Sequence, residues 1–298
     1  MVSRGDQGKT GQPDYTVRSH FHTPPSQFNG CFTTFYHLSL QVENGGTIED
    51  FLQPEWSNIR FFAGSSPKAE LADCKISGAR FNATGPSSLP CHFELGSCEM
   101  WGIGFLPLGW ARFIDEDAHS LANTAWDGRN SSAFAKFEVL SDVLCDLDAT
   151  REEQAALIAA TMENLMQPSR DEPKILRVHN ALVDGSFLAV KDLAEACGMS
   201  IRTLERVCCR YFGFTPKRLM RRQRFIRSLT SYMLHRGSRW TEAMDADYHD
   251  QAQFTREFHE FMTMNPSEYA ALDHPILSSF MEARARIWGS AAQALDRP

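Results

Sequence analysis

Basic side chains gather in one part of the sequence, where their density suits contacts with a polyanion. Between Met199 and Arg239 there are eleven Lys and Arg residues and one acidic residue, Glu205, so this segment has a net charge of +10. The whole chain has a net charge of −7, which makes the remainder strongly acidic. Phosphate binding needs local positive charge, and such an asymmetry indicates a polyanionic partner. On charge alone, a solvated basic helix face is the alternative.

An internal repeat places these charges on two similar units. A shift of 49 or 50 residues aligns Ala194 with Ala243, Leu204 with Phe254, Arg206 with Arg256 and Pro216 with Pro266. Each copy has the layout of a helix-turn-helix, with a short helix, a turn and a second helix that carries an apolar stripe. In the first copy Gly198 suits a left-handed turn and Ser200 caps the second helix. In the second copy Asp250 is the expected cap.

The second helix of each copy presents polar side chains opposite its apolar stripe. Such a helix fits the major groove, where Gln suits adenine and Arg suits guanine or phosphate. A helix from Pro216 to about Met233 joins the copies and spans about 25 Å, which allows two reading helices about one turn of B-DNA apart. The predicted DNA contacts are Ser200, Ile201, Arg202, Thr203, Arg206 and Arg210 in the first copy, Lys217, Arg221 and Arg222 on the joining helix, and Gln251, Gln253, Thr255 and Arg256 in the second copy.

These motifs resemble the DNA-binding domain of the AraC/XylS family of bacterial transcription regulators. The resemblance covers about residues 174–272 and is carried by residues 193–200, 202–206, 212–216, 250–258 and 265–269. It implies a sequence-specific transcription regulator that binds double-stranded DNA and works with RNA polymerase. The family usually has glycine where this sequence has Asp247 in the second turn and Thr263 after the second helix. Asp tolerates the left-handed conformation better than most residues, so we expect the turn at Asp247 to form.

The first part of the chain has the patterns of a small all-β sandwich or barrel followed by helices. Alternation over Phe32–Val42 predicts a half-buried strand. Further strands are predicted at Ile59–Phe62, Ala79–Asn82, Cys91–Leu95 and Met100–Phe105. The expected fold class is α+β, with a cupin-like N-terminal β-barrel and a C-terminal all-α domain. The expected ranges are 1–166 for a sensory and dimerisation domain (barrel about 26–113, helices about 132–166), 167–173 for a linker, 174–272 for the DNA-binding domain and 273–298 for a tail.

The resemblance also implies a role for the barrel, because in this family such a domain often binds a small effector. An apolar pocket is predicted from the aromatic residues Phe35, Phe62, Trp101, Phe105 and Trp110, for which a plain core role is the alternative. Helices after the barrel often dimerise in the family. The stretch from Phe134 to Met166 therefore either pairs with a second copy in a homodimer or packs on its own barrel. The amphipathic stretch Ile276–Trp288 in the tail has no predicted role.

Composition and motifs exclude several other classes. The sequence lacks a run of about 18 apolar residues, and Met1–Gln12 is polar, so we expect neither a membrane span nor secretion. The eight scattered cysteines suit reduced thiols in the cytoplasm. Cys91, His92 and Cys98 lack the paired spacing of a zinc site, and neither a metal nor another cofactor is expected. Redox control through Cys208 and Cys209 stays open.

An enzyme is the main alternative to a regulator. A cupin-type catalyst or a DNA-repair alkyltransferase fused to the same DNA-binding module is conceivable, although the four-cysteine zinc cluster of the second is absent from the sequence. Phosphate-binding loops, zinc-protease motifs and nucleophile elbows are also absent. A protein-binding adaptor is a third class, and the basic segment argues against it. We therefore expect no catalytic activity.

Overall fold

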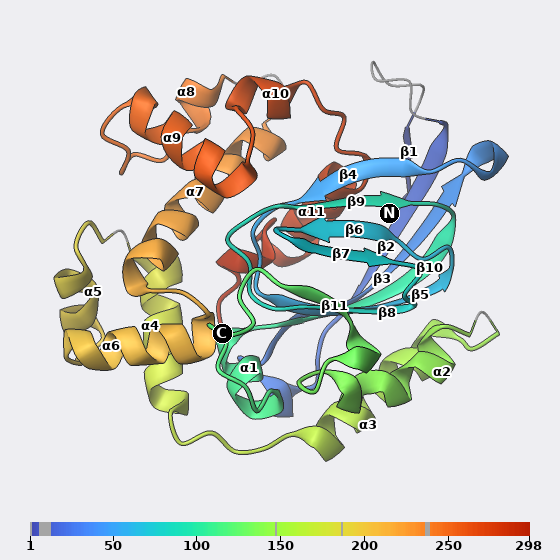
Figure 1. The fold of residues 1–298 in the computed structure, drawn as a ribbon, viewed down its shortest axis with the longest axis horizontal. Coiled ribbons are helices and arrows are strands. Elements are labelled where there is room, and N and C mark those ends of the chain that lie inside the picture. Colours follow the sequence, from blue (N-terminus) through green and yellow to red (C-terminus); the bar gives the residue numbers. More distant parts are fainter. Residues whose placement is uncertain (1, 6–12, 147, 186, 236–238) are drawn as a thin grey trace.

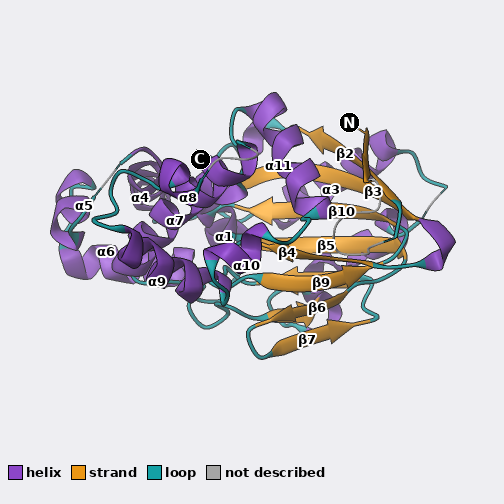
Figure 2. Cartoon of the chain, turned by 90° about the horizontal axis from the view of Figure 1, so that it is seen from above, coloured by secondary structure: helices purple, strands orange, loops and turns teal. Residues whose placement is uncertain are grey.

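The computed structural model describes residues 2–5, 13–146, 148–185, 187–235 and 239–298. Strands fill one side of the molecule and the helices α4 to α10 the other (Figures 1 and 2). Leu147, inside the helical stretch predicted over 132–166, lies outside the described residues. None of the helices in the described ranges combines the length and apolar character that crossing a membrane requires.

The N-terminal part consists of two antiparallel sheets. The larger has seven strands in the order β1-β2-β3-β10-β5-β8-β11, and the smaller has four in the order β4-β9-β6-β7. The strands are β1 Val2–Gly5, β2 Tyr15–His22, β3 Phe32–Val42, β4 Ile48–Leu52, β5 Ser57–Gly64, β6 Lys68–Leu71, β7 Cys74–Ser77, β8 Phe81–Thr84, β9 Cys91–Leu95, β10 Cys98–Phe105 and β11 Ala125–Asp127. Apolar residues of both sheets share one core, as in a sandwich. The cupin-like arrangement is therefore present as two facing sheets and not as a closed barrel.

Both faces of the larger sheet are buried. Met100 of β10 lies opposite Leu38 and Phe62, and their side chains point toward the smaller sheet. The next residue, Trp101, lies opposite His37 and Phe61 and points to the other face, where helices cover it. These helices are α1 Pro107–Phe113, α2 Ser141–Leu144 and α3 Arg151–Leu165. The helical stretch after the strands thus packs on its own sheet, one of the two arrangements left open by the sequence.

The C-terminal part forms the two predicted helix-turn-helix units. Its helices are α4 Glu172–Asp184, α5 Val190–Ala196, α6 Ile201–Val207, α7 Pro216–Leu234, α8 Trp240–Ala243, α9 Gln251–Met262, α10 Pro266–Ala270 and α11 Pro275–Trp288. Both expected caps are confirmed, because Ser200 Oγ accepts from the Thr203 amide at 3.2 Å and Asp250 from the Gln253 amide at 2.6 Å. The pyrrolidine of Pro216 occupies the first turn of α7, as predicted.

The first copy has two left-handed residues, and the described part of the second copy has one. Gly198 has φ +64°, as expected for the first turn. In the second copy the turn at Asp247 forms, as expected, but Asp247 does not adopt the left-handed conformation. The left-handed residue of the second copy is Thr263, with φ +57°, which ends α9 at the position that aligns with the left-handed Gly213, φ +85°, in the first copy. A β-branched residue in this conformation stores strain that the surrounding core must hold.

Gln154 in α3 ties this helix to the larger sheet, and its removal should destabilise the fold. Its Oε1 accepts from the Trp101 indole N–H at 2.7 Å, and its Nε2 donates to the carbonyls of Val143 and Asp146. Gln154→Leu leaves these buried groups unpaired, so we expect the free energy of unfolding in urea to fall by about 1–3 kcal/mol. Asn164→Leu, an exposed position on the same helix, is the control and should change it little. Equal effects of the two substitutions would contradict this role.

Candidate nucleic-acid interface

The first reading helix, α6, exposes the face that the sequence predicts for DNA. Leu204, Val207 and Cys208 are fully buried, whereas Ile201 is 43% exposed despite its apolar side chain. Four further predicted contacts are solvent-exposed: Ser200, Arg202, Arg206 and Arg210. Arg206 and Arg210 face Asp171 and Asp117 at 3.9 and 3.4 Å, and both arginines are more than half exposed. The pair of Arg210 and Asp117 is exposed on both sides, and Arg206 only just reaches Asp171, so both pairs are weak and phosphate can displace them.

The second reading helix, α9, is built in the same way. Phe254, Phe258 and Phe261 are buried on one side, while Gln251 and Arg256 are exposed on the other. The predicted contacts Gln253 and Thr255 are half-buried. Gln253 Oε1 accepts from the His249 amide at 3.0 Å, which leaves its amide nitrogen as the group that can donate to a base or phosphate.

A basic groove of about 800 Å³ connects the joining helix α7 to the start of α9. Its Lys and Arg side chains are Lys217, Arg221, Arg224, Arg227 and Arg256, its amide side chains are Gln223 and Gln253, and its carboxylates are Asp247, Glu257 and Glu260. Four predicted DNA contacts therefore lie in one concave surface: Lys217, Arg221, Gln253 and Arg256. They come from parts of the chain more than 30 residues apart. Its five Lys and Arg side chains outnumber its three carboxylates, so the groove keeps a net positive charge that attracts a polyanion.

Arginines of α7 also neutralise the acidic residues of the second copy. Glu257, with a side chain only 4% exposed, accepts from Arg221 at 2.8 Å and from Arg224 at 2.6 Å. Glu260 pairs with Arg221, and Asp245 accepts from Arg227 at 2.5 Å. These pairs fix the second copy against α7. Arg221 is thus shared between a structural contact and the groove.

The sequence predicts Arg222 as a DNA contact, but the structure buries it inside the protein. Its side chain is completely buried, and its guanidinium carbon lies 3.9 Å from the centre of the Trp56 ring. Its Nη1 donates to the Ser87 carbonyl at 2.9 Å and to the Glu55 carbonyl at 3.4 Å. Burial and the nearby charge of Arg218 lower the pKa of Arg222 to about 9. In this arrangement Arg222 joins α7 to the N-terminal sheets and does not reach DNA.

Trp56 is the centre of this contact between the N-terminal part and the first copy. Its ring packs edge-on against His179 of α4 and Phe212, with centroids 5.7 and 5.8 Å away. Residues of the sheets and of α4 to α6 belong to one continuous apolar core. The first helix-turn-helix is therefore fixed to the N-terminal part through shared packing and not through a flexible linker.

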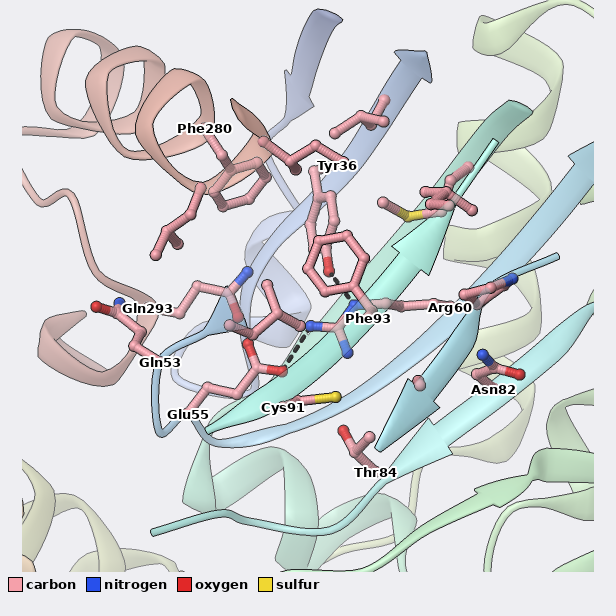
Figure 3. Close-up of a pocket in the computed structure, with 18 of the residues that line it drawn as sticks. Tyr36, Gln53, Glu55, Arg60, Asn82, Thr84, Cys91, Phe93, Phe280 and Gln293 are labelled. Carbon is pink, nitrogen blue, oxygen red and sulfur yellow. Dashed lines mark hydrogen bonds and ion pairs between the residues drawn. The ribbon is translucent and has the colours of Figure 1, made fainter. Parts of the chain in front are cut away.

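A cavity of about 100 Å³ lies between the two sheets (Figure 3). Its walls are mostly apolar, with Leu38, Phe62 and Met100 from the larger sheet and Phe93 and Leu95 from the smaller. Its polar lining residues are Gln53, Asn82, Thr84, Gln293 and a bonded group of three. In this group Arg60 Nη2 donates to Glu55 at 2.6 Å, and Arg60 Nε donates to the Tyr36 hydroxyl at 3.0 Å. Burial raises the pKa values of both Tyr36 and Glu55.

The cavity shares one residue with the pocket predicted from aromatic side chains. Phe62 lines it, whereas Phe35, Trp101, Phe105 and Trp110 belong to the core on the opposite face of the larger sheet. The reason is strand alternation, since neighbouring residues of a buried strand point to different layers. The face that carries Tyr36 and Leu38 was evident from the alternation in Phe32–Val42 and would have located the cavity better than residue type did.

The vicinal cysteines of the first copy are poorly placed for redox chemistry. Cys208 is fully buried and Cys209 is half-buried. Burial raises the pKa of both thiols, that of Cys208 well above its ordinary value. The thiolate, which is the reactive form, is therefore disfavoured at both positions.

His179 should make the stability of the interface depend on pH. Burial lowers its pKa from 6.5 to about 3, so between these values the unfolded chain binds a proton that the folded chain does not. The free energy of unfolding therefore decreases as the pH falls below 6.5, by about 2 kcal/mol at pH 5. We expect His179→Phe to lose less free energy of urea unfolding between pH 7 and pH 5 than the wild type. The exposed His249→Phe is the control, and an equal loss in all three proteins would contradict the assignment.

Comparisons with known proteins bear on the helical part. A family model described as a helix-turn-helix domain matches residues 193–271, which include both copies. No curated protein matches the chain. Among solved structures, ToxT from Vibrio cholerae has 9% identity and a TM-score of 0.46, covering 87% of this chain and 99% of its own. ToxT bound to (E)-4-(8-methylnaphthalen-1-yl)but-3-enoic acid has 8% identity and a TM-score of 0.45, covering 86% and 98%. The AraC-like transcriptional activator CuxR has 14% identity and a TM-score of 0.28, covering 70% and 85%.

Proposed function

The chain carries the helix-turn-helix domain of the AraC family of transcription regulators, and from this premise we propose that it binds two successive major-groove segments through α6 and α9. The single observation that supports this most is the groove that joins Lys217 and Arg221 to Gln253 and Arg256. Phosphates lying along this groove would hold the duplex against α7, with both reading helices beside it.

The roles of the chain's parts follow from this proposal. Residues 1–166 sense a ligand, 167–173 connect, and 174–272 bind DNA. RNA polymerase and a second copy of this chain are further proposed partners, to which we assign no residues. A one-component regulator of this kind acts in the cytoplasm, where the chromosome is accessible, and needs no catalytic step.

We further propose that the cavity between the sheets holds the effector, and its chemistry indicates a class. The positive charge of Arg60 is already balanced by Glu55, so a charged ligand would have to break a buried ion pair. The other walls are mostly apolar, with the uncharged polar side chains of Gln53, Asn82, Thr84 and Gln293 among them. A small, neutral and largely apolar molecule with one polar end that bonds to Tyr36 or Glu55 fits best.

Arg202 and Arg206 should contribute to base or phosphate recognition. Arg202→Ala or Arg206→Ala should weaken binding to the duplex that the wild type retains best from a random pool by about 1–3 kcal/mol, as measured by fluorescence anisotropy. Arg129→Ala is the control, because this arginine pairs with Asp127 beside the larger sheet, away from both reading helices. If both variants bind as the control does, α6 does not read DNA.

Xenon should enter the cavity, because an apolar space of this kind accepts a gas atom without any polar match. We expect ¹²⁹Xe NMR of the full-length protein to show a bound environment that Ala69→Phe removes, since Ala69 lines the cavity. Ala270→Phe, an exposed position on α10, should leave the bound signal intact. A signal that survives Ala69→Phe would place the binding elsewhere and would remove the support for an effector site here.

A further inference from the structure

The C-terminal tail returns from the second helix-turn-helix to the N-terminal sheets. In Figure 1, α11 continues from α10 and lies beside β4. Each of its first two turns places one side chain in one core and one side chain in another. Ile276 and Phe280 pack in the core between the sheets, whereas Leu277 and Met281 pack in the core of the second copy. Because residues four apart lie on one face of a helix, α11 has two buried faces that bridge the two cores.

A buried carboxylate fixes the first turn of α11. Asp50 of β4 accepts from the amides of Ile276 and Leu277 at 2.8 and 2.7 Å. It also faces the His274 ring at 3.2 Å, and the other nitrogen of this ring lies 3.0 Å from the Tyr269 carbonyl. The Tyr269 side chain is buried in the second copy. A short chain of contacts therefore runs from a strand next to the cavity into the second reading unit.

The end of the tail provides a second link of the same kind. Gln293 Oε1 accepts from Asn58 Nδ2 of β5 at 3.2 Å, and the Ala294 carbonyl accepts from Gln223 Nε2 of α7 at 2.7 Å. Arg284, which is almost fully buried, holds this segment to α11 through Asp296 at 2.6 Å. The tail thus connects the larger sheet to α7 as well.

The tail also forms one wall of the cavity. The lining residues that it supplies are Ile276, Leu277, Phe280, Met281, Ala291 and Gln293. Figure 3 shows Phe280 on its helix beside Tyr36, and the ring centroids of Phe280 lie 5.0 Å from Tyr36 and 5.2 Å from Phe21. The other walls are mostly strands, whose backbones are bonded to neighbours in their sheets. The tail is held to the sheets by side-chain packing and a few side-chain hydrogen bonds and not by a backbone ladder, so it is the wall that yields most easily to an occupant.

We propose that residues 275–296 transmit occupancy of the cavity to the second helix-turn-helix. This inference rests on the proposed function of the cavity. A ligand larger than the present space displaces Phe280 and Ile276, and α11 carries Leu277 and Met281 with it. The first copy stays in place, because its core is continuous with that of the sheets. Occupancy then changes the position of α9 relative to α6. This change alters how well the two helices fit two major-groove segments one DNA turn apart.

Hydrogen exchange of the full-length protein without DNA tests the link. Phe280→Ala removes contacts with Phe21 and Tyr36, which both belong to the sheets, and we expect amides of α9 to exchange at least about 10-fold faster while those of α6 stay unchanged. Phe28→Ala, which removes a ring from the core shared with the first copy, is the matched control and should leave α9 unchanged. The milder Phe280→Leu serves if Phe280→Ala is broadly unfolded.

Two results would overturn the inference: an unchanged α9 in Phe280 variants whose α11 amides exchange faster, or equal acceleration of α6 and α9 in Phe280→Leu. Because this readout needs no DNA, it separates the inference from the proposed function. Failure of the wild type to bind duplex DNA, with the exchange coupling intact, would count against the regulator alone. Intact DNA binding without the coupling would count against the tail alone.

Discussion

The guanidinium of Arg222, stacked on Trp56 and bonded to the Ser87 carbonyl, fixes the first half of α7 against the N-terminal sheets. A buried cation needs such partners, and removing them would leave its charge unsolvated. Since both reading units are attached to α7, this contact sets where they lie relative to the sheets. The arginines on either side of it, Arg221 and Arg224, then hold the second unit through Glu257.

Because both faces of the larger sheet are buried, the sheet encloses a cavity on one side and supports helices on the other. One face, with Trp101, supports the helices and a core that continues into the first reading unit. The other face, with Tyr36 and Phe62, encloses the cavity together with the smaller sheet. The tail closes this space and continues the core of the second unit, so each reading unit has its own packed route to the sheets.

Local signals in the sequence were sufficient for the helical part. Caps at Ser200 and Asp250 and the proline at Pro216 define helix starts through groups only a few residues away. The burial of Arg222 was not predictable from local signals, because its hydrogen-bond partners lie 135 and 167 residues earlier in the chain. The same holds for Asp50 and the tail, which are separated by more than 220 residues. Alternation gave the two faces of β3, but the partner of each face depends on tertiary packing.

The central claim is that one chain reads two groove segments whose spacing is set by α7. The most direct test is to incubate the full-length protein with a pool of random duplexes over a salt series and to sequence what is retained. The account predicts an enriched motif of two blocks about 10 base pairs apart, centre to centre. Retention that falls with salt but enriches no motif, or a single block, would contradict it.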